Sequence, residues 1–291
     1  MAGLSKTNDD ATPAPAAGVL RFAGLLLDRP LVMGIVNVTP DSFSDGGRYA
    51  ETDAAIAHGR RLREEGADIL DIGGESTRPG AAPLAPEAEL ARVIPVIRAL
   101  AAEGALISID TRRAVVMRAA IEAGARIVND VTALTGDADS LAVVRESGVS
   151  VVLMHMLGDP QTMQVKPVYA DVVREVSAYL AERVQACRAA GLAAERIAVD
   201  PGIGFGKTVE HNLSLLAGTA RLRALGVAVL VGASRKAFIG RLSRGEPAPE
   251  RVAGSVAAAL AAIERGAHIV RVHDVAATRQ ALSVWQAVER A

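Results

Sequence analysis

Polar and charged side chains follow short apolar runs at intervals along this chain. Carboxylate, amide, hydroxyl and cationic groups all occur among them, at Asn37, Asp71, Asp110, Asn129, His155, Asp200, Ser234, Arg271 and His273. A single such residue could simply cap the helix that follows it. A buried polar group costs on the order of 1–3 kcal/mol unless it is paired, so a whole series of them predicts a polar ligand.

The residue types restrict what this ligand can be. Asp110, Asn129 and Asp200 can exchange hydrogen bonds with the N–H edge of a heterocycle such as an aminopyrimidinone. Cationic or potentially cationic groups stand near other run ends, at Arg78, Lys236, Arg271 and His273. Such groups suit a phosphate or diphosphate. The set predicts a planar, donor-rich base that carries an anionic leaving group.

The Gly-rich segment DPGIGFGKT, residues 200–208, could be mistaken for a nucleotide-binding loop. A Walker A motif needs Gly where this chain has Pro201, and the glycine spacing also fails the dinucleotide fingerprint. ATP and NAD are therefore poor candidates. The segment instead predicts a tight turn after a strand, where the backbone can approach a flat ligand and Phe205 stands at the centre.

Eight short apolar runs alternate with longer stretches of helical periodicity. The runs occupy residues 31–38, 67–73, 105–110, 126–131, 149–155, 196–200, 227–234 and 267–273. Helical spacing of apolar residues marks 52–66, 86–104, 112–124 and 250–266. Only 3% of residues are aromatic, so small aliphatic side chains must build the core. This composition suits helices packed on buried parallel strands.

Eight strand and helix units in about 250 residues predict a (β/α)8 TIM barrel in a single domain. Glycines expected to end helices precede six of the runs, at Gly66, Gly104, Gly124, Gly148, Gly226 and Gly266. An open doubly wound sheet is the competing fold, although eight strands are many for it. We expect residues 19–291 to form the barrel domain, with a hairpin near 19–28 at its bottom, and residues 1–18 to be a disordered tail.

Composition excludes several function classes. The 32 basic and 33 acidic side chains give a net charge of −1, so there is no overall positive field for nucleic acid or an anionic membrane. Cys187 is the single cysteine, which favours a reducing compartment and excludes an intrachain disulfide. The first residues lack a signal-peptide pattern, and no apolar stretch is long enough to cross a membrane. We therefore expect a cytoplasmic protein.

Several separate motifs resemble one enzyme family. They are GIVNVTPDSFSDGG (34–47), GADILDIGGESTRPG (66–80), SIDT (108–111), IVNDV (127–131), LMHM (153–156), DPGIGFGK (200–207), GASRK (232–236) and RVHD (271–274). Together they resemble the dihydropteroate synthases of bacterial folate biosynthesis, from about residue 31 to residue 278. The resemblance implies a transferase that condenses 6-hydroxymethyl-7,8-dihydropterin diphosphate with p-aminobenzoate and releases diphosphate. It also implies Mg²⁺, a homodimer and competition by sulfonamides.

The resemblance also implies roles for individual residues. Asp110, Asn129 and Asp200 would hold the pterin, Met154 and Phe205 would pack near its ring, and Lys236 would contact its polar rim. Diphosphate or its metal would bind Asn37, Arg271 and His273. The p-aminobenzoate pocket would be framed by Phe43, Thr77, Arg78, Pro79, Ser234 and Arg235. Asp110, Asp200, Lys236 and Arg271 would carry most of the chemistry.

Some alternatives stay open. A pterin-dependent methyltransferase would use a related barrel and similar acidic groups, but it needs neither GASRK nor STRPG. A non-catalytic pterin-binding module would have little use for the complete cationic set. Asp71 could touch the ligand or orient its neighbours, and His155 could be a ligand contact or a structural histidine. The long Gly/Pro/Ser-rich segments after the first two runs, which include Phe43 and Arg78, are expected to act as mobile lids.

Overall fold

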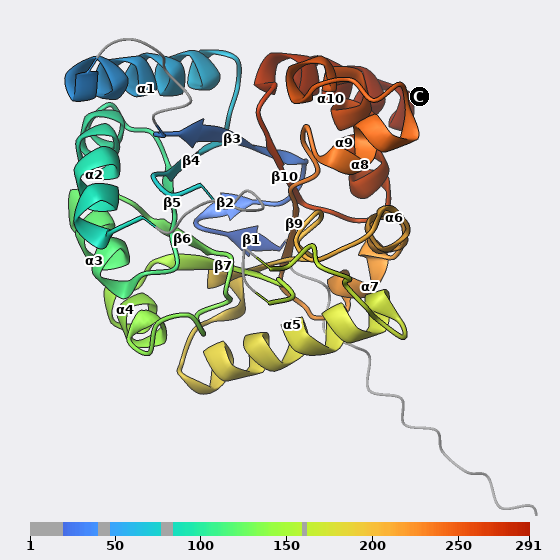
Figure 1. Cartoon of the computed structure of the whole chain (residues 1–291), viewed down its shortest axis with the longest axis horizontal. Helices are drawn as coiled ribbons and strands as arrows, with labels where there is room; N and C mark the ends of the chain where they lie inside the picture. Colours follow the sequence, from blue (N-terminus) through green and yellow to red (C-terminus); the bar gives the residue numbers. More distant parts are fainter. Residues whose placement is uncertain (1–19, 40–46, 77–83, 159–161) are drawn as a thin grey trace, which may run out of the picture.

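Eight parallel strands close into a barrel in the computed structural model, which describes residues 20–39, 47–76, 84–158 and 162–291 (Figure 1). They are β3 (Leu31–Asn37), β4 (Ile69–Gly73), β5 (Ile107–Asp110), β6 (Ile127–Asp130), β7 (Ser150–Met154), β8 (Ile197–Asp200), β9 (Ala228–Val231) and β10 (Ile269–Val272). Neighbours pair in chain order, and β10 closes the ring by pairing with both β9 and β3. The predicted (β/α)8 barrel is confirmed, and the open doubly wound sheet is excluded.

Helices surround the strands on all sides (Figure 1). Those described are α1 (Gly47–Glu64), α2 (Pro86–Ala102), α3 (Ala114–Ala123), α4 (Ser140–Ser147), α5 (Val172–Ala189), α6 (Val209–Ala217), α7 (Thr219–Arg223), α8 (Ala237–Leu242), α9 (Val252–Glu264) and α10 (Val275–Glu289). Short 3-10 helices cover Ala194–Arg196 and Ala248–Glu250. All six glycines expected to end helices have positive φ, between 67° and 122°. No helix in the described ranges is long and apolar enough to cross a membrane.

A two-stranded hairpin closes the amino-terminal end of the barrel, as predicted. It consists of β1 (Arg21–Phe22) and β2 (Leu25–Leu26), paired antiparallel. Phe22 is fully buried against an inner core that includes Leu31 and Met33 of β3. Apolar packing thus seals this end, so a ligand must enter from the other. The expected tail, residues 1–18, lies outside the described residues.

The alternation of side chains along each strand decides which residues face the barrel interior. In β5, Ile107 and Ile109 pack in the outer core between strands and helices, so Ser108 and Asp110 face inward. The inward positions are apolar near the amino ends of the strands and mostly polar near the carboxyl ends. At the carboxyl ends they are Asn37, Asp71, Asp110, Asn129, Met154, Asp200 and Arg271. Strand register therefore brings together residues that are far apart in the sequence.

Candidate active site

Arg271 occupies the centre of the polar end of the barrel. Its Nε donates to Asp71 Oδ2 at 2.5 Å, and its Nη2 donates to Asp110 Oδ2 at 2.7 Å. Burial alone would lower the pKa of Arg271, but the Asp71 and Asp110 carboxylates raise it above its usual value. The guanidinium therefore stays charged, and two carboxylates fix its orientation.

Two further carboxyl groups in the pocket have perturbed acidity. Burial raises the pKa of Asp110 to about 7, because the opposing charge of Arg271 offsets only part of the cost of desolvation. Burial also raises the pKa of Asp200, although Gly202 N–H donates to its Oδ1 at 2.7 Å. Perturbed carboxyl groups in one pocket are typical of functional sites.

Lys236 and Phe205 form the rim expected for the pterin. The Lys236 Nζ lies 4.0 Å from the centroid of the Phe205 ring, which is a cation–π contact. Burial and the nearby Arg271 lower the pKa of Lys236 to about 8, while Asp200 and Asp110 oppose the shift. The rim thus combines an ammonium, an aromatic ring and a nearby carboxylate.

Asp71 lies beneath this pocket. Its side chain is fully buried, and its Oδ2 accepts hydrogen bonds from both Arg271 and Asn129 Nδ2, the latter at 3.0 Å. These contacts fit its possible role of orienting neighbouring groups. Met154 is also buried, at the end of β7 beside Asp200 of β8.

The ends of β9 and β10 contribute a second polar group. Ser234 Oγ lies 3.1 Å from His273 Nδ1 and also accepts the His273 backbone N–H at 3.2 Å. The Ser234 hydroxyl can therefore donate to Nδ1. In this tautomer the imidazole hydrogen is on Nε2, which can act as a donor. Burial, together with Arg271 and Arg235, lowers the pKa of His273 to about 3. His273, a potentially cationic group in the sequence, is thus neutral near pH 7 and can donate from Nε2.

Arg235, expected beside the p-aminobenzoate pocket, has a defined partner. Its Nε and Nη2 donate to the two carboxylate oxygens of Asp274 at 2.9 and 2.6 Å. Its backbone has φ of 58°, and its N–H donates to Ser255 Oγ at 2.8 Å. These contacts hold the turn between Ser234 and Lys236 in one conformation.

The Gly-rich turn after β8 is held from below by a residue that the sequence analysis did not single out. The almost fully buried Lys207 donates to the Phe205 carbonyl at 2.9 Å and to His155 Nδ1 at 3.1 Å. Burial, together with the Lys207 charge, lowers the pKa of His155 to about 3. His155 also packs edge-on against Tyr179, at 5.1 Å between ring centroids. It is therefore a structural histidine.

A second group missed by the sequence analysis joins the two sides of residues 77–83. Glu75 accepts the Leu84 N–H at 3.0 Å and pairs with Arg113 at 2.9 Å, while Arg113 also donates to the Leu84 carbonyl at 2.5 Å. Buried Glu89 completes the network through Arg113. The predicted ligand contacts Phe43, Thr77, Arg78 and Pro79, and the lid role of their segments, lie outside the described residues.

The described part of the chain holds no cluster of metal-ligating side chains. Asn37 ends β3 next to Gly73 of β4, and the described residues contain no group of three or more His, Cys, Asp or Glu side chains that could hold a metal ion. Mg²⁺ commonly binds one or two protein oxygens, several waters and substrate phosphates. A single amide oxygen at Asn37 is compatible with Mg²⁺ that is held mainly by a substrate diphosphate.

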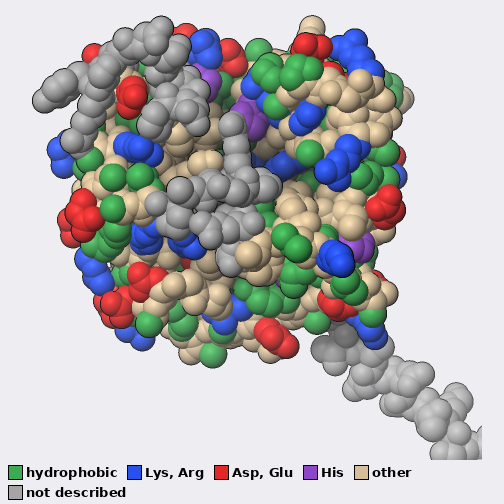
Figure 2. Space-filling model, viewed as in Figure 1, with side chains coloured by type: hydrophobic (Ala, Val, Ile, Leu, Met, Phe, Trp, Pro, Cys, Tyr) green, Lys and Arg blue, Asp and Glu red, His purple; other side chains and the backbone are tan. Residues whose placement is uncertain are grey.

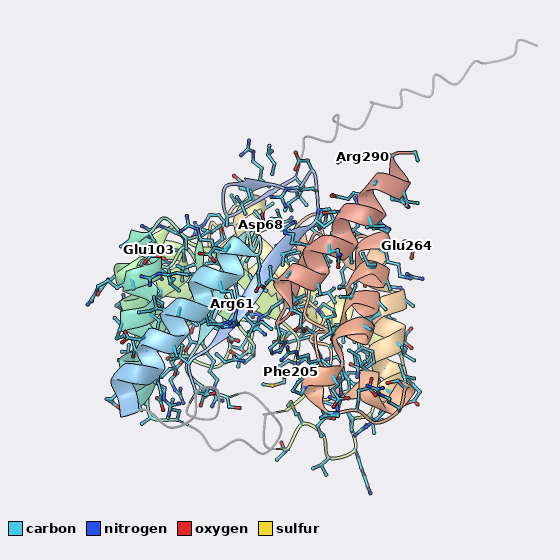
Figure 3. The ribbon with its side chains drawn as sticks, turned by 90° about the horizontal axis from the view of Figure 1, so that it is seen from above. Arg61, Asp68, Glu103, Phe205, Glu264 and Arg290 are labelled. Atoms are coloured by element: carbon cyan, nitrogen blue, oxygen red, sulfur yellow. The ribbon has the colours of Figure 1, made fainter. Side chains whose placement is uncertain are left out.

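The described site residues lie at the carboxyl ends of the strands, which Figures 2 and 3 show from two directions. Figure 2 looks onto the carboxyl ends of the strands and shows Lys, Arg and His side chains beside a central hollow. Figure 3 shows Phe205 at the end of the barrel opposite to Asp68. The described site residues thus gather at the open end.

Comparisons with known proteins identify the family. The profile of the pterin binding enzymes matches residues 33–273. Dihydropteroate synthase of Neisseria meningitidis serogroup B is 53% identical over 267 residues, 90% of this chain and 94% of that protein. The Xanthomonas albilineans dihydropteroate synthase has been solved with 4-aminobenzoic acid (56% identity, TM-score 0.88, 94% and 98% of the two chains). Its structure with 7,8-dihydropteroate gives 53% identity and a TM-score of 0.85, over 94% and 99%. This chain belongs to the pterin binding enzyme family, among the dihydropteroate synthases.

Proposed function

We propose that this protein condenses 6-hydroxymethyl-7,8-dihydropterin diphosphate with p-aminobenzoate, giving 7,8-dihydropteroate and diphosphate. One observation carries the proposal: Asp110, Asn129 and Asp200 converge from three strands on a single pocket that also holds Arg271 and Lys236. Acceptors for a donor-rich base thus stand beside cations for its leaving group. Solved relatives in complex with 4-aminobenzoic acid, the proposed second substrate, and with 7,8-dihydropteroate, the proposed product, support the proposal.

Hydrogen-bond acceptors and apolar side chains hold the pterin. Asp200 and Asp110 accept from its N–H groups, and Phe205 and Met154 pack near its ring. Lys236, which already lies over Phe205, contacts the polar rim of the base. These groups come from the rigid strand ends and from the clamped Gly-rich turn, so they orient the base with little rearrangement.

The bond change is a substitution at the methylene carbon. The amine nitrogen of p-aminobenzoate forms a bond to this carbon, the C–O bond to diphosphate breaks, and the amine loses one proton to solvent. Developing positive charge on the methylene is stabilised by the buried carboxylates, while Arg271 and the Nε2–H of His273 stabilise the departing anion. A free aromatic amine needs no strong base, so positioning and exclusion of water dominate.

Magnesium is assigned to the diphosphate. Asn37 would hold the ion from the end of β3, and the bound ion would supply charge neutralisation for the leaving group. Ser234 and Arg235 would frame p-aminobenzoate together with Phe43, Thr77, Arg78 and Pro79. The last four stay predictions from the sequence.

We also infer a cytoplasmic homodimer. The buried Cys187, whose pKa burial raises to about 11, is an inert thiol, as a protein of a reducing compartment would have. The dimer rests on the family resemblance. Light scattering of the purified protein tests it, and a monomer at micromolar concentration would contradict it.

Turnover tests the function. Purified protein with Mg²⁺ and both substrates should release diphosphate and form dihydropteroate in equal amounts. A methyltransferase or a binding module would bind the pterin without releasing diphosphate. Absence of product where a known synthase works would overturn the proposal.

A further inference from the structure

One buried carboxylate contacts two groups of the pocket. Asp71 is fully buried and sits between Ile35 of β3 and Ser108 of β5 in the strand register. Its side chain is therefore closed off from solvent, and its Oδ1 has no hydrogen-bond partner among the described residues. Asp71 contacts the pocket through Asn129 and Arg271, which both donate to its Oδ2.

The contact with Asn129 settles which way its amide faces. An Asn side chain can present either a carbonyl oxygen or an NH₂ group to a ligand. Here the Asn129 nitrogen lies 3.0 Å from Asp71 Oδ2. A rotated amide would bring two oxygen acceptors together at that distance, which is unfavourable in a buried site. The same carboxylate oxygen also accepts from the Arg271 guanidinium, so it cannot serve as a donor.

We propose that Asp71 is a positioning residue that orients the Asn129 amide, so that Asn129 offers its carbonyl Oδ1 to the pterin and accepts from an N–H of the base. The inference rests on the proposed function. With Asp110 and Asp200, Asn129 then completes a row of acceptors. Such a row binds a base with an amino group more tightly than a similar base in which oxygen replaces that amino group. The replacement oxygen would face the protein oxygens, and these buried acceptors would be left without a donor.

The test compares two probes, 6-hydroxymethylpterin and its analogue in which the 2-amino group is replaced by oxygen. Calorimetry gives the affinity for each, and their ratio measures the discrimination. Wild-type protein should bind the pterin at least tenfold more tightly. D71N keeps the side-chain size but adds an NH₂ group that can donate to Asn129 Oδ1, so the discrimination should fall at least fivefold.

Asp68→Asn is the matched control. Asp68 is likewise a largely buried carboxylate that accepts from two arginines, Arg29 and Arg279, but at the opposite end of the barrel (Figure 3). It should leave the discrimination ratio unchanged. An equal fall in both variants would mean that the ratio reports general loosening, and it would overturn the proposal.

A double-mutant cycle separates the two routes from Asp71. In an Asn129→Ala background, D71N should no longer change the discrimination ratio, because the oriented amide is gone. If the ratio still falls in that background, Asp71 acts through Arg271 and the proposal is wrong. If the wild-type protein binds no pterin at all, the proposed function is wrong. If the wild-type protein binds pterin but D71N behaves like the control variant, only the proposed role of Asp71 is wrong.

A measurement on the unaltered protein covers the case in which D71N does not fold. The Asn129 side-chain amide signals in ¹H–¹⁵N spectra are identified by their absence from Asn129→Ala. The proposal predicts that one of the two amide hydrogens exchanges slowly with solvent, because it is bonded to a buried carboxylate. A pair of signals that exchange rapidly with solvent would contradict it.

Discussion

Arg271 and Asp110 are hydrogen-bonded to each other, at 2.7 Å between Nη2 and Oδ2, although the sequence predicts different ligands for them. Arg271 is expected to bind the diphosphate and Asp110 the pterin. The two halves of the substrate site are therefore coupled through one ion pair. The charge of Arg271 lowers the pKa of Asp110 against the stronger opposite effect of burial.

This coupling predicts the pH dependence of pterin binding. The ionised Asp110 carboxylate accepts hydrogen bonds from a donor-rich base more strongly than the neutral acid does, so its pKa of about 7 predicts weaker pterin binding below neutral pH. Arg271→Gln removes the charge that holds this pKa down, so the acid limb should move to higher pH. Calorimetry between about pH 5 and pH 9 measures how the pterin affinity depends on pH. Arg279→Gln, at the far end of the barrel, is the control. An acid limb that does not move would contradict the coupling.

Asp200→Asn should stabilise the protein while it weakens binding. Burial raises the folded-state pKa of Asp200, so its ionisation disfavours folding, and the cost grows as the pH rises through that pKa. The variant should melt at a higher temperature than wild type near pH 8, with a gain that shrinks towards acid pH. Pterin affinity should fall roughly tenfold or more.

Asp68→Asn should destabilise the protein and leave pterin binding unchanged. The bonds with Arg29, Val32 N–H and Arg279 outweigh burial and lower the pKa of Asp68, so its stabilising contribution is present near neutral pH and is lost as the pH falls through the lowered pKa. The variant should have a lower melting temperature than the wild type at neutral pH and an unchanged pterin affinity. A destabilised Asp200→Asn would show that Asp200 is a structural residue.

Gly202→Ala tests the turn that carries Phe205. Gly202 has φ of 68°, and an added Cβ would lie 2.0 Å from the His155 carbonyl oxygen, so the turn must move. Gly148 has a similar φ of 75° with nothing within 4 Å of an added Cβ. Gly148→Ala should cost about 1 kcal/mol of stability and leave pterin binding intact. Gly202→Ala should also weaken pterin binding, and equal affinities in both variants would contradict the role of the turn.

The chain order of runs and helices was enough to predict the barrel, because each strand and helix unit is local. It also predicted that Asp110, Asn129 and Asp200 share one pocket, since the carboxyl ends of parallel strands meet. The role of Asp71 could not be predicted, because its partner Arg271 is 200 residues away and only barrel closure joins them. Lys207 was hidden for a similar reason, since its partner His155 lies 52 residues earlier.

Sulfonamides should compete with p-aminobenzoate and not with the pterin. They carry an aniline and an acidic group in the arrangement of that substrate, while the pterin pocket of Asp110 and Asp200 requires a donor-rich base. Steady-state rates should show a raised KM for p-aminobenzoate with unchanged kcat. A sulfonamide that competes with the pterin diphosphate would place the aniline site elsewhere.

Diphosphate release measured with and without p-aminobenzoate tests the central claim most directly. With Mg²⁺ and the pterin diphosphate alone, the wild-type protein should release little diphosphate, and adding p-aminobenzoate should produce release matched one to one by dihydropteroate. Asp200→Asn, which is expected to fold, should lose most of this turnover. Release that does not depend on p-aminobenzoate, or full turnover by Asp200→Asn, would contradict the account of a pocket in which strand-end carboxylates hold the pterin for attack by the amine.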